Sequence, residues 1–118
     1  VTHNGTKKTG LDPIEFAKCL QDSGAGEIVI NSVDLDGTMQ GYDISLVHKM
    51  CEHIHIPMTV IGGAGKLEDV ATLWKSNGLI GAAAGSLFVF KGKYRAVLIN
   101  YPNISEKTAL LGRSGWKI

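Results

Sequence analysis

Three short apolar runs, separated by segments with helical spacing, constrain the fold of this chain more than any other feature. The runs cover residues 27–33, 58–61 and 79–84. A short run of apolar and β-branched residues bounded by turn signals is typical of a strand that is buried on both faces. Strands that alternate with helices predict βαβ units, and therefore an α/β fold with a parallel sheet.

Helical patterns fill the intervals between these runs. Asp12, Pro13 and Glu15 make a good helix start, because Asp12 can accept backbone N–H bonds and Pro13 suits the first helical position. Gly24 is placed to end that helix. Further helices are expected over residues 43–56 and 67–77. The strands thus repeat every roughly 20 to 30 residues, the size of one βα unit in a barrel.

The chain after Phe90 is less regular. Residues 94–101 fit a short helix or a strand, and Pro102 ends that segment. A weak helical pattern lies near residues 105–111.

Composition excludes several classes of protein. The net charge of +1 over 118 residues gives no electrostatic footprint for nucleic acid. No apolar run has the length of a membrane span. Cys19 and Cys51 fit reduced thiols of a cytoplasmic protein better than a disulfide or a metal pair. The opening at Val1 favours a fragment of a longer chain.

Each strand end carries residues suited to ligand binding. In parallel α/β folds, ligands bind at the carboxyl ends of the strands. Glycine-rich turns let backbone N–H groups approach a phosphate closely, and a serine adds a hydroxyl donor. The alternative is that these glycines only permit tight turns. The candidates are Asn31, Asp34, Asp36 and Gly37 after the first strand, Gly62, Gly63 and Ala64 after the second, and Gly85 and Ser86 after the third.

The two aspartates predict proton-transfer chemistry. A carboxyl group at a half-buried strand mouth can act as a general acid or base. One of the pair could instead bond to backbone N–H groups of its own loop. Because no third acidic residue lies on the other two strand ends, we expect no metal site, and no motif indicates a cofactor.

Four segments in unbroken order resemble the cyclase subunit of imidazole glycerol phosphate synthase. They are VTHNGTKKTGLD, GAGEIVINSVDLDGTMQGYD, IGGAGKLED and AAAGSLFVF. The resemblance implies the C-terminal (βα)₄ half of a (βα)₈ TIM barrel. The implied layout is one partial domain over residues 1–118, with a hairpin at 1–9, βα units over about 10–101 and a tail over 102–118.

The resemblance also implies roles for the candidate residues. Asp36 matches the catalytic general acid/base at the end of strand six. The glycine turns, Asn31 and Ser86 match positions around a substrate phosphate, and Asn4 matches a polar position in the first hairpin. Ammonia from a glutaminase partner would convert a phosphorylated ribulosyl nucleotide to imidazole glycerol phosphate and aminoimidazole carboxamide ribotide. The opposing catalytic aspartate lies outside this chain, so the fragment alone is expected to be inactive.

Three alternatives stay open. The line NSVDLDGT and the tail VLINYPN look like a paralogue that supplies ammonia for sugar amidation in surface polysaccharide synthesis. A sugar-phosphate isomerase of the same architecture would need no glutaminase. A non-catalytic half-barrel would be an interaction module or would dimerise without chemistry. In each of these cases the chain is expected to pair with the missing N-terminal half of the barrel or with a second copy of itself.

Overall fold

The structure is an α/β arrangement in which helices alternate with short strands. The computed structural model describes residues 5–78, 80–113 and 115. Its elements in chain order are α1 (Pro13–Asp22), β1 (Ile28–Asn31), α2 (Ile44–His53), β2 (Met58–Ile61), α3 (Leu67–Asn77), β3 (Gly81–Ala82), α4 (Ser86–Val89), β4 (Phe90–Lys91), β5 (Ala96–Val97) and α5 (Ile104–Arg113).

Side-chain caps fix the starts of the longer helices. The Asp12 carboxylate accepts the N–H groups of Ile14 and Glu15 at 2.9 and 3.0 Å, so α1 begins where the sequence predicts. Asp43 caps α2 in the same way, with the Leu46 N–H at 3.0 Å. Each such cap stabilises a helix by about 1 kcal/mol.

The parallel sheet predicted from the alternation is confirmed. Its order is β1-β2-β3, and both pairings are parallel. The third strand is shorter than expected, since pairing stops after the Ala83 N–H donates to the Val60 carbonyl at 2.8 Å. Residue 79, at the start of the expected strand, lies outside the described residues.

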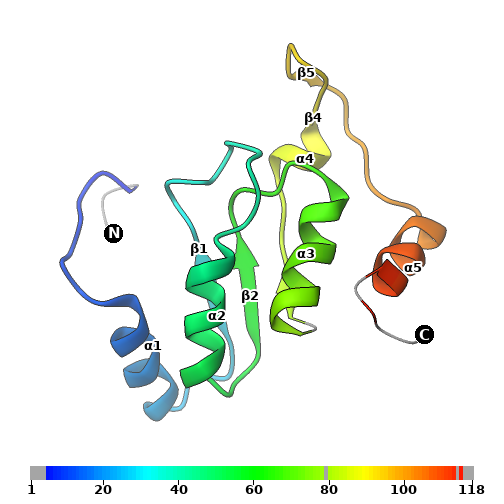
Figure 1. Ribbon diagram of the computed structural model, residues 1–118. Helices are drawn as coiled ribbons and strands as arrows, with labels where there is room; N and C mark the ends of the chain where they lie inside the picture. Colours follow the sequence, from blue (N-terminus) through cyan, green and yellow to red (C-terminus); the bar gives the residue numbers. More distant parts are fainter. Residues whose placement is uncertain (1–4, 79, 114, 116–118) are drawn as a thin grey trace.

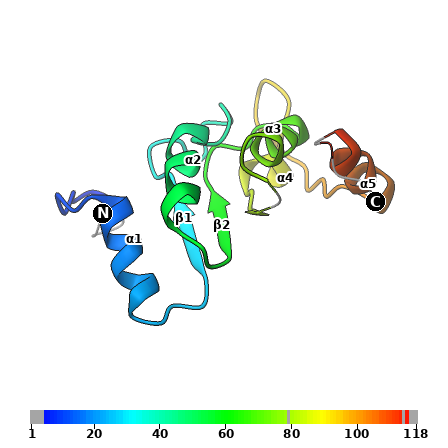
Figure 2. The same ribbon diagram turned by 60° about the horizontal axis from the view of Figure 1, so that its bottom comes forward.

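The helices cover only one face of this sheet. Ile28, Ile30, Met58 and Val60 are buried against α1, α2 and α3, and Figures 1 and 2 show α2 and α3 lying along the strands. On the other face Val29 is 63% exposed. The prediction that the first strand is buried on both faces is therefore wrong for this chain, because none of its described elements packs on that second face.

The C-terminal part departs from a fourth βα unit. After α4 the chain forms an antiparallel β4–β5 hairpin, which stands out beyond the sheet in Figure 1. Of the helix and the strand that were expected as alternatives for residues 94–101, the structure shows a strand, which covers β5. The weak helix near 105–111 is confirmed as α5, whose Leu110 packs with Val70 and Leu73 of α3. The hairpin expected at 1–9 falls partly outside the described residues.

Across the ranges that the structure describes, every helix is too short or too polar to span a bilayer.

Candidate functional site

The three parallel strands end at a common edge of the sheet, which we call the rim. Because β1, β2 and β3 run in one direction, the loops that follow them meet there. These loops cover residues 32–43, 62–66 and 83–85. The rim receives every candidate residue from the sequence except Asn4, which lies outside the described residues.

The first loop holds Asp34 and Asp36 in a tight turn. The Ser32 carbonyl accepts the N–H groups of Leu35 and Asp36 at 3.1 and 2.9 Å. Both aspartates are exposed, and neither carboxylate bonds to another described residue. Among these residues nothing supports the alternative that one of them caps backbone groups of the loop, so both carboxylates are available to a ligand.

Gly37 brings this loop to the end of β3. It adopts a φ of +76°, and a Cβ built on it would lie 3.9 Å from the Ser86 Oγ. The Gly37 carbonyl also accepts a hydrogen bond from the Arg95 guanidinium, at 3.1 Å. The residue next to Asp36 is therefore hydrogen-bonded to a cation and lies near a serine hydroxyl. Arg95, whose guanidinium stacks on the Phe90 ring at 4.8 Å, was not predicted from the sequence.

The first loop also lies directly on the glycine turn after β2. The Gly41 N–H donates to the Gly63 carbonyl at 2.7 Å. Gly63 has a φ of +105°, and a Cβ there would run into the Gly41 carbonyl. A Cβ on Gly62 would lie 2.7 Å from the Ser32 carbonyl. These glycines are thus required by the close approach of two loops, beyond the needs of a tight turn.

Backbone donors remain available in this turn. Gly62, Gly63 and Ala64 are buried, and none of their N–H groups donates to another described residue. Buried N–H groups are almost always paired, so we expect an acceptor for these groups outside the described residues. The next two N–H groups, of Gly65 and Lys66, already donate to the Asp69 carboxylate at 2.8 and 3.0 Å. The Asp69 carboxylate therefore already binds the N–H groups at the start of α3.

Tyr42 fastens the first loop to the third strand and was also missed by sequence reasoning. Its hydroxyl donates to the Ala83 carbonyl at 2.9 Å, and its ring is 7% exposed. Burial, and secondarily the negative charge of Asp69, raises the pKa of Tyr42 to about 12. The phenol therefore stays protonated at neutral pH and keeps its donor role. The only sequence signal was an aromatic residue immediately before a helix cap.

Two remaining candidates lie at the margins of the rim. Asn31 ends β1 on the uncovered face of the sheet and is exposed, with its Oδ1 2.9 Å from the position of a Cβ on Gly62. Gly85 is exposed at the start of α4, and a Cβ there would touch nothing within 4 Å. The close approach that explains the other glycines does not apply to Gly85.

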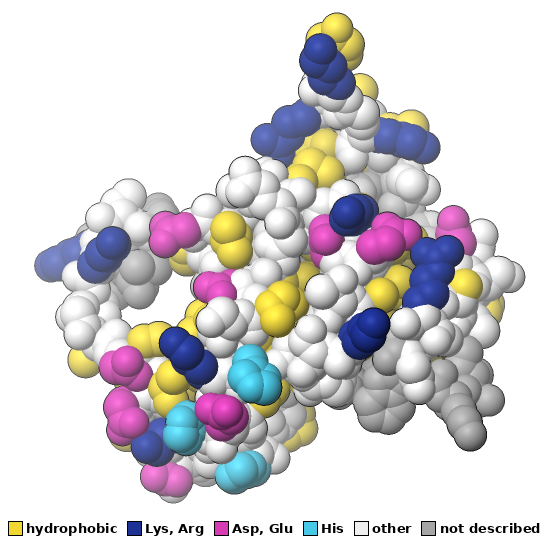
Figure 3. Space-filling view, viewed as in Figure 1, with side chains coloured by type: hydrophobic (Ala, Val, Ile, Leu, Met, Phe, Trp, Pro, Cys, Tyr) yellow, Lys and Arg dark blue, Asp and Glu magenta, His cyan; other side chains and the backbone are white. Residues whose placement is uncertain are grey.

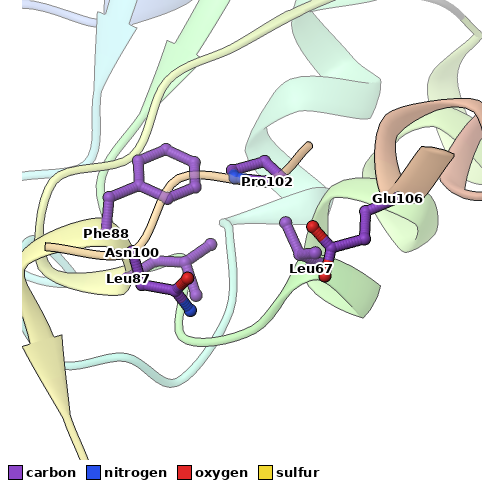
Figure 4. A pocket seen from close by; sticks show the side chains of 6 residues that line it. All are labelled: Leu67, Leu87, Phe88, Asn100, Pro102 and Glu106. Carbon is purple, nitrogen blue, oxygen red and sulfur yellow. The ribbon is translucent and has the colours of Figure 1, made fainter. Parts of the chain in front are cut away.

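A small cavity beside the rim does not contain the candidate residues. Figure 4 shows Phe88, Leu67 and Glu106 around it, together with Leu87, Asn100 and Pro102. Its volume of about 40 Å³ suits a few water molecules and is too small for a sugar phosphate. Within the described part of the chain, no three His, Cys, Asp or Glu side chains gather as metal ligands would.

Comparison with known proteins identifies the family. A family model described as "Histidine biosynthesis protein" matches residues 1–95. A Vibrio vulnificus protein with the provisional name imidazole glycerol phosphate synthase subunit hisF3 is 58% identical over 93% of this chain and 42% of its own length. A Leptospira interrogans protein, provisionally named as the HisF subunit of the same synthase, is 53% identical over 92% of the chain and 42% of its own length.

A third relative is named without qualification. The imidazole glycerol phosphate synthase subunit HisF of Hyphomonas neptunium is 43% identical over 97% of this chain and 42% of its own length. The chain thus spans less than half the length of these curated relatives. It belongs to the histidine biosynthesis protein family.

Proposed function

We propose that this chain supplies the proton-transfer group and the phosphate-binding rim of a cyclase subunit of imidazole glycerol phosphate synthase. The observation that carries the proposal is the meeting of three strand ends. The loop that bears Asp36 lies on the glycine turn and reaches Ser86 through Gly37. An acid/base group beside a set of anion donors suits a phosphorylated substrate that must gain and lose protons.

The anion site in this proposal is built from backbone and hydroxyl donors. The N–H groups of Gly62, Gly63 and Ala64 are buried without a described acceptor, and the Ser86 hydroxyl lies at the neighbouring strand end. The Arg95 guanidinium adds positive charge at the same rim. Phosphate oxygens accept such bonds readily, and charge-assisted bonds are the stronger ones.

Asp36 acts as the general acid/base in this proposal. Its carboxylate is exposed at the rim and has no bond to another described residue, so it can meet a substrate directly. The reaction is the one implied by the resemblance: ammonia from a glutaminase partner attacks a ribulosyl nucleotide, and cyclisation with cleavage gives imidazole glycerol phosphate and aminoimidazole carboxamide ribotide. Asp36 would move protons during these steps. The remaining catalytic groups, and the rest of a (βα)₈ barrel, would come from the part of the relatives that this chain does not span.

An Asp36→Asn variant tests this role in the complete protein, assayed with its ribulosyl substrate and ammonia. We expect kcat to fall by about 10² to 10⁴ fold, the usual contribution of a general acid or base. Asp22→Asn is the matched control, because Asp22 is an exposed aspartate at the end of α1, away from the rim. Equal kcat values for the two variants would refute the assignment. We further expect the chain without the rest of the barrel to show no steady-state turnover.

A second candidate function is ammonia supply for sugar amidation in surface polysaccharide synthesis. The line NSVDLDGT and the segment VLINYPN favour it, because both resemble such paralogues. The rim would be the same in both cases. Turnover of the ribulosyl nucleotide by the complete protein distinguishes the two, since a subunit that only supplies ammonia should leave this substrate unchanged.

A further inference from the structure

Arg95 has a backbone conformation that an arginine does not favour. It is the last residue of the turn between β4 and β5, where its N–H donates to the Gly92 carbonyl at 3.0 Å. Its φ is +50°, a left-handed value that glycine adopts far more readily. Residues held in such conformations need other contacts to keep them there, and they cluster at functional sites. The turn alone therefore does not explain an arginine at this position.

Two contacts hold the Arg95 side chain at the rim. The guanidinium carbon lies 4.8 Å from the centroid of the Phe90 ring, which supports the group from one side. The Nη2 atom donates to the Gly37 carbonyl at 3.1 Å. This hydrogen bond joins the β4–β5 hairpin to the loop that carries Asp36, although the two bonded residues are 58 positions apart in the chain.

The hairpin is itself anchored beside Ser86. Two backbone N–H groups of the segment that follows β5 donate to carbonyls of α4, both at 2.8 Å. The Phe88 ring of α4 packs against the Tyr101 ring of that segment, with centroids 5.1 Å apart. Because α4 begins at Ser86, the hairpin that bears Arg95 is held relative to that serine.

We propose that Arg95 is a positioning residue that holds the Asp36 carboxylate in place relative to the anion donors of the rim. It acts through the Gly37 carbonyl and need not touch the substrate. Gly37 follows Asp36 directly, and a Cβ on Gly37 would lie 3.9 Å from the Ser86 Oγ. The hydrogen bond therefore restrains the loop where it approaches the serine. This inference rests on the proposed function of Asp36 and adds a residue to it.

The other bonds of the first loop leave this restraint to Arg95. Hydrogen bonds within residues 32–38 define the shape of the turn around Asp36, but they do not fix the turn relative to the other strand ends. The long-range bonds of Gly41 and Tyr42 lie further along the loop, toward α2. The Asp36 side chain is exposed, so packing does not position it. The bond from Arg95 supplies a long-range contact at the residue next to the carboxylate.

A general electrostatic role of the hairpin is the alternative. Its basic residues are Lys91, Lys93 and Arg95, and Figure 3 shows basic side chains gathered on the hairpin at the top of the view. Such a cluster would attract an anionic substrate without fixing any group of the protein. Lys93 separates the two roles, because it is exposed in the same turn and makes no hydrogen bond or ion pair to a described residue.

The test is the steady-state kinetics of the complete protein with its ribulosyl substrate and ammonia. We expect Arg95→Met to lower kcat by about 10 to 100 fold and to change KM by less than about threefold, because a misplaced acid/base group slows the reaction without weakening substrate binding. Arg95→Gly should show the same loss, and it keeps the turn because glycine adopts a positive φ without strain. Lys93→Met is the matched control and should leave both constants unchanged. A raised KM with unchanged kcat, or equal effects of Arg95→Met and Lys93→Met, would overturn the proposal.

An Asp36→Asn background shows whether Arg95 acts through Asp36. In that background we expect Arg95→Gly to change kcat by less than about twofold, since the group that it positions is already lost. The same fold loss in both backgrounds would show that Arg95 acts independently, which overturns the inference. If Asp36→Asn keeps the wild-type kcat, or if the complete protein shows no turnover, the proposed function fails and this inference fails with it. If Asp36→Asn is impaired while the Arg95 variants are not, only this inference fails.

Hydrogen exchange measures the restraint without catalysis. The amides of residues 35–38 should exchange at least about threefold faster in Arg95→Gly than in the wild type, because a local opening of the loop no longer breaks a long-range bond. Lys93→Met should exchange as the wild type does. Equal protection in all three proteins would show that the bond to Gly37 does not restrain the loop, and the positioning role would be refuted.

Discussion

The contact between the aspartate loop and the glycine turn can be tested by adding one methyl group at Gly63. In the Gly63→Ala variant the new Cβ would run into the Gly41 carbonyl, and the alanine would have to adopt a φ of +105°. A non-glycine residue held at positive φ costs about 1 to 3 kcal/mol. Relief of the clash would push the loops apart and break the 2.7 Å bond from the Gly41 N–H to the Gly63 carbonyl, worth about 1 kcal/mol.

The backbone strain can be separated from the contact by a control glycine. Gly24 has a similar φ of +96°, but a Cβ there would meet nothing within 4 Å. Gly24→Ala should therefore cost only the strain. We expect Gly63→Ala to lower the free energy of unfolding by about 2 to 4 kcal/mol and Gly24→Ala by about 1 to 3 kcal/mol.

Urea unfolding followed by circular dichroism measures both values on the purified protein. A loss of unfolding free energy that is about 1 kcal/mol larger for Gly63→Ala than for Gly24→Ala would support the close approach of the two loops. If the two variants unfold at the same urea concentration with equal slopes, the loops do not press on each other and the geometry of the rim is wrong. A loss of about 3 kcal/mol is a large share of the 5 to 15 kcal/mol typical of a domain, so the assay has ample range.

Three further predictions concern other residues. Tyr42→Phe should cost about 1 to 3 kcal/mol of unfolding free energy, because the Ala83 carbonyl loses its donor. Since the folded pKa of Tyr42 is raised from 10.0 to about 12, the wild type should keep its full stability below pH 10 and lose stability between pH 10 and 12, whereas the variant should lose less in a urea series over that range. Asn103→Ala should lower α5 stability by about 1 kcal/mol, seen as faster hydrogen exchange there, because Asn103 and Glu106 cap each other's backbone N–H groups. Millimolar phosphate should raise the melting temperature, and Ser86→Ala should reduce that rise; the absence of any shift would favour a non-catalytic module.

Local signals in the sequence were sufficient for α1, α2 and α3, whereas the short helix α4 (Ser86–Val89) was not predicted. Asp12 followed by Pro13 predicts the start of α1, and the structure shows the expected cap. The start of α5 was less clear because the reciprocal cap between Asn103 and Glu106 was not recognised, and the helix begins at Ile104, earlier than the pattern near 105–111 suggested. Such signals depend on neighbours a few residues apart, which a sequence displays directly.

Burial of the first strand could not be predicted in the same way. An apolar run such as 27–33 indicates a buried strand, but it does not say what covers each face. Here Ile28 and Ile30 pack against helices, while Val29 faces no described element. The run is compatible with a closed barrel, and the covering strands would have to come from outside this chain.

The rim shows the same division between local and long-range information. Alternating strands and helices suffice to place Asp36, Gly63 and Ser86 at one edge of a sheet. The contacts that hold them there join residues far apart in the chain, such as Tyr42 with Ala83 and Arg95 with Gly37. No spacing rule indicates those partners. A polar or aromatic side chain in a glycine-rich loop was the only available hint.

Two hydrogen bonds limit how far the first loop can move. Tyr42 donates to the Ala83 carbonyl after β3, and the Gly41 N–H donates to the Gly63 carbonyl after β2. The loop therefore cannot move away from the sheet without breaking both hydrogen bonds and exposing the buried ring of Tyr42. The Asp36 carboxylate therefore stays exposed at a fixed place on the rim, and in the proposed function it would meet a ligand without movement of the loop that carries it.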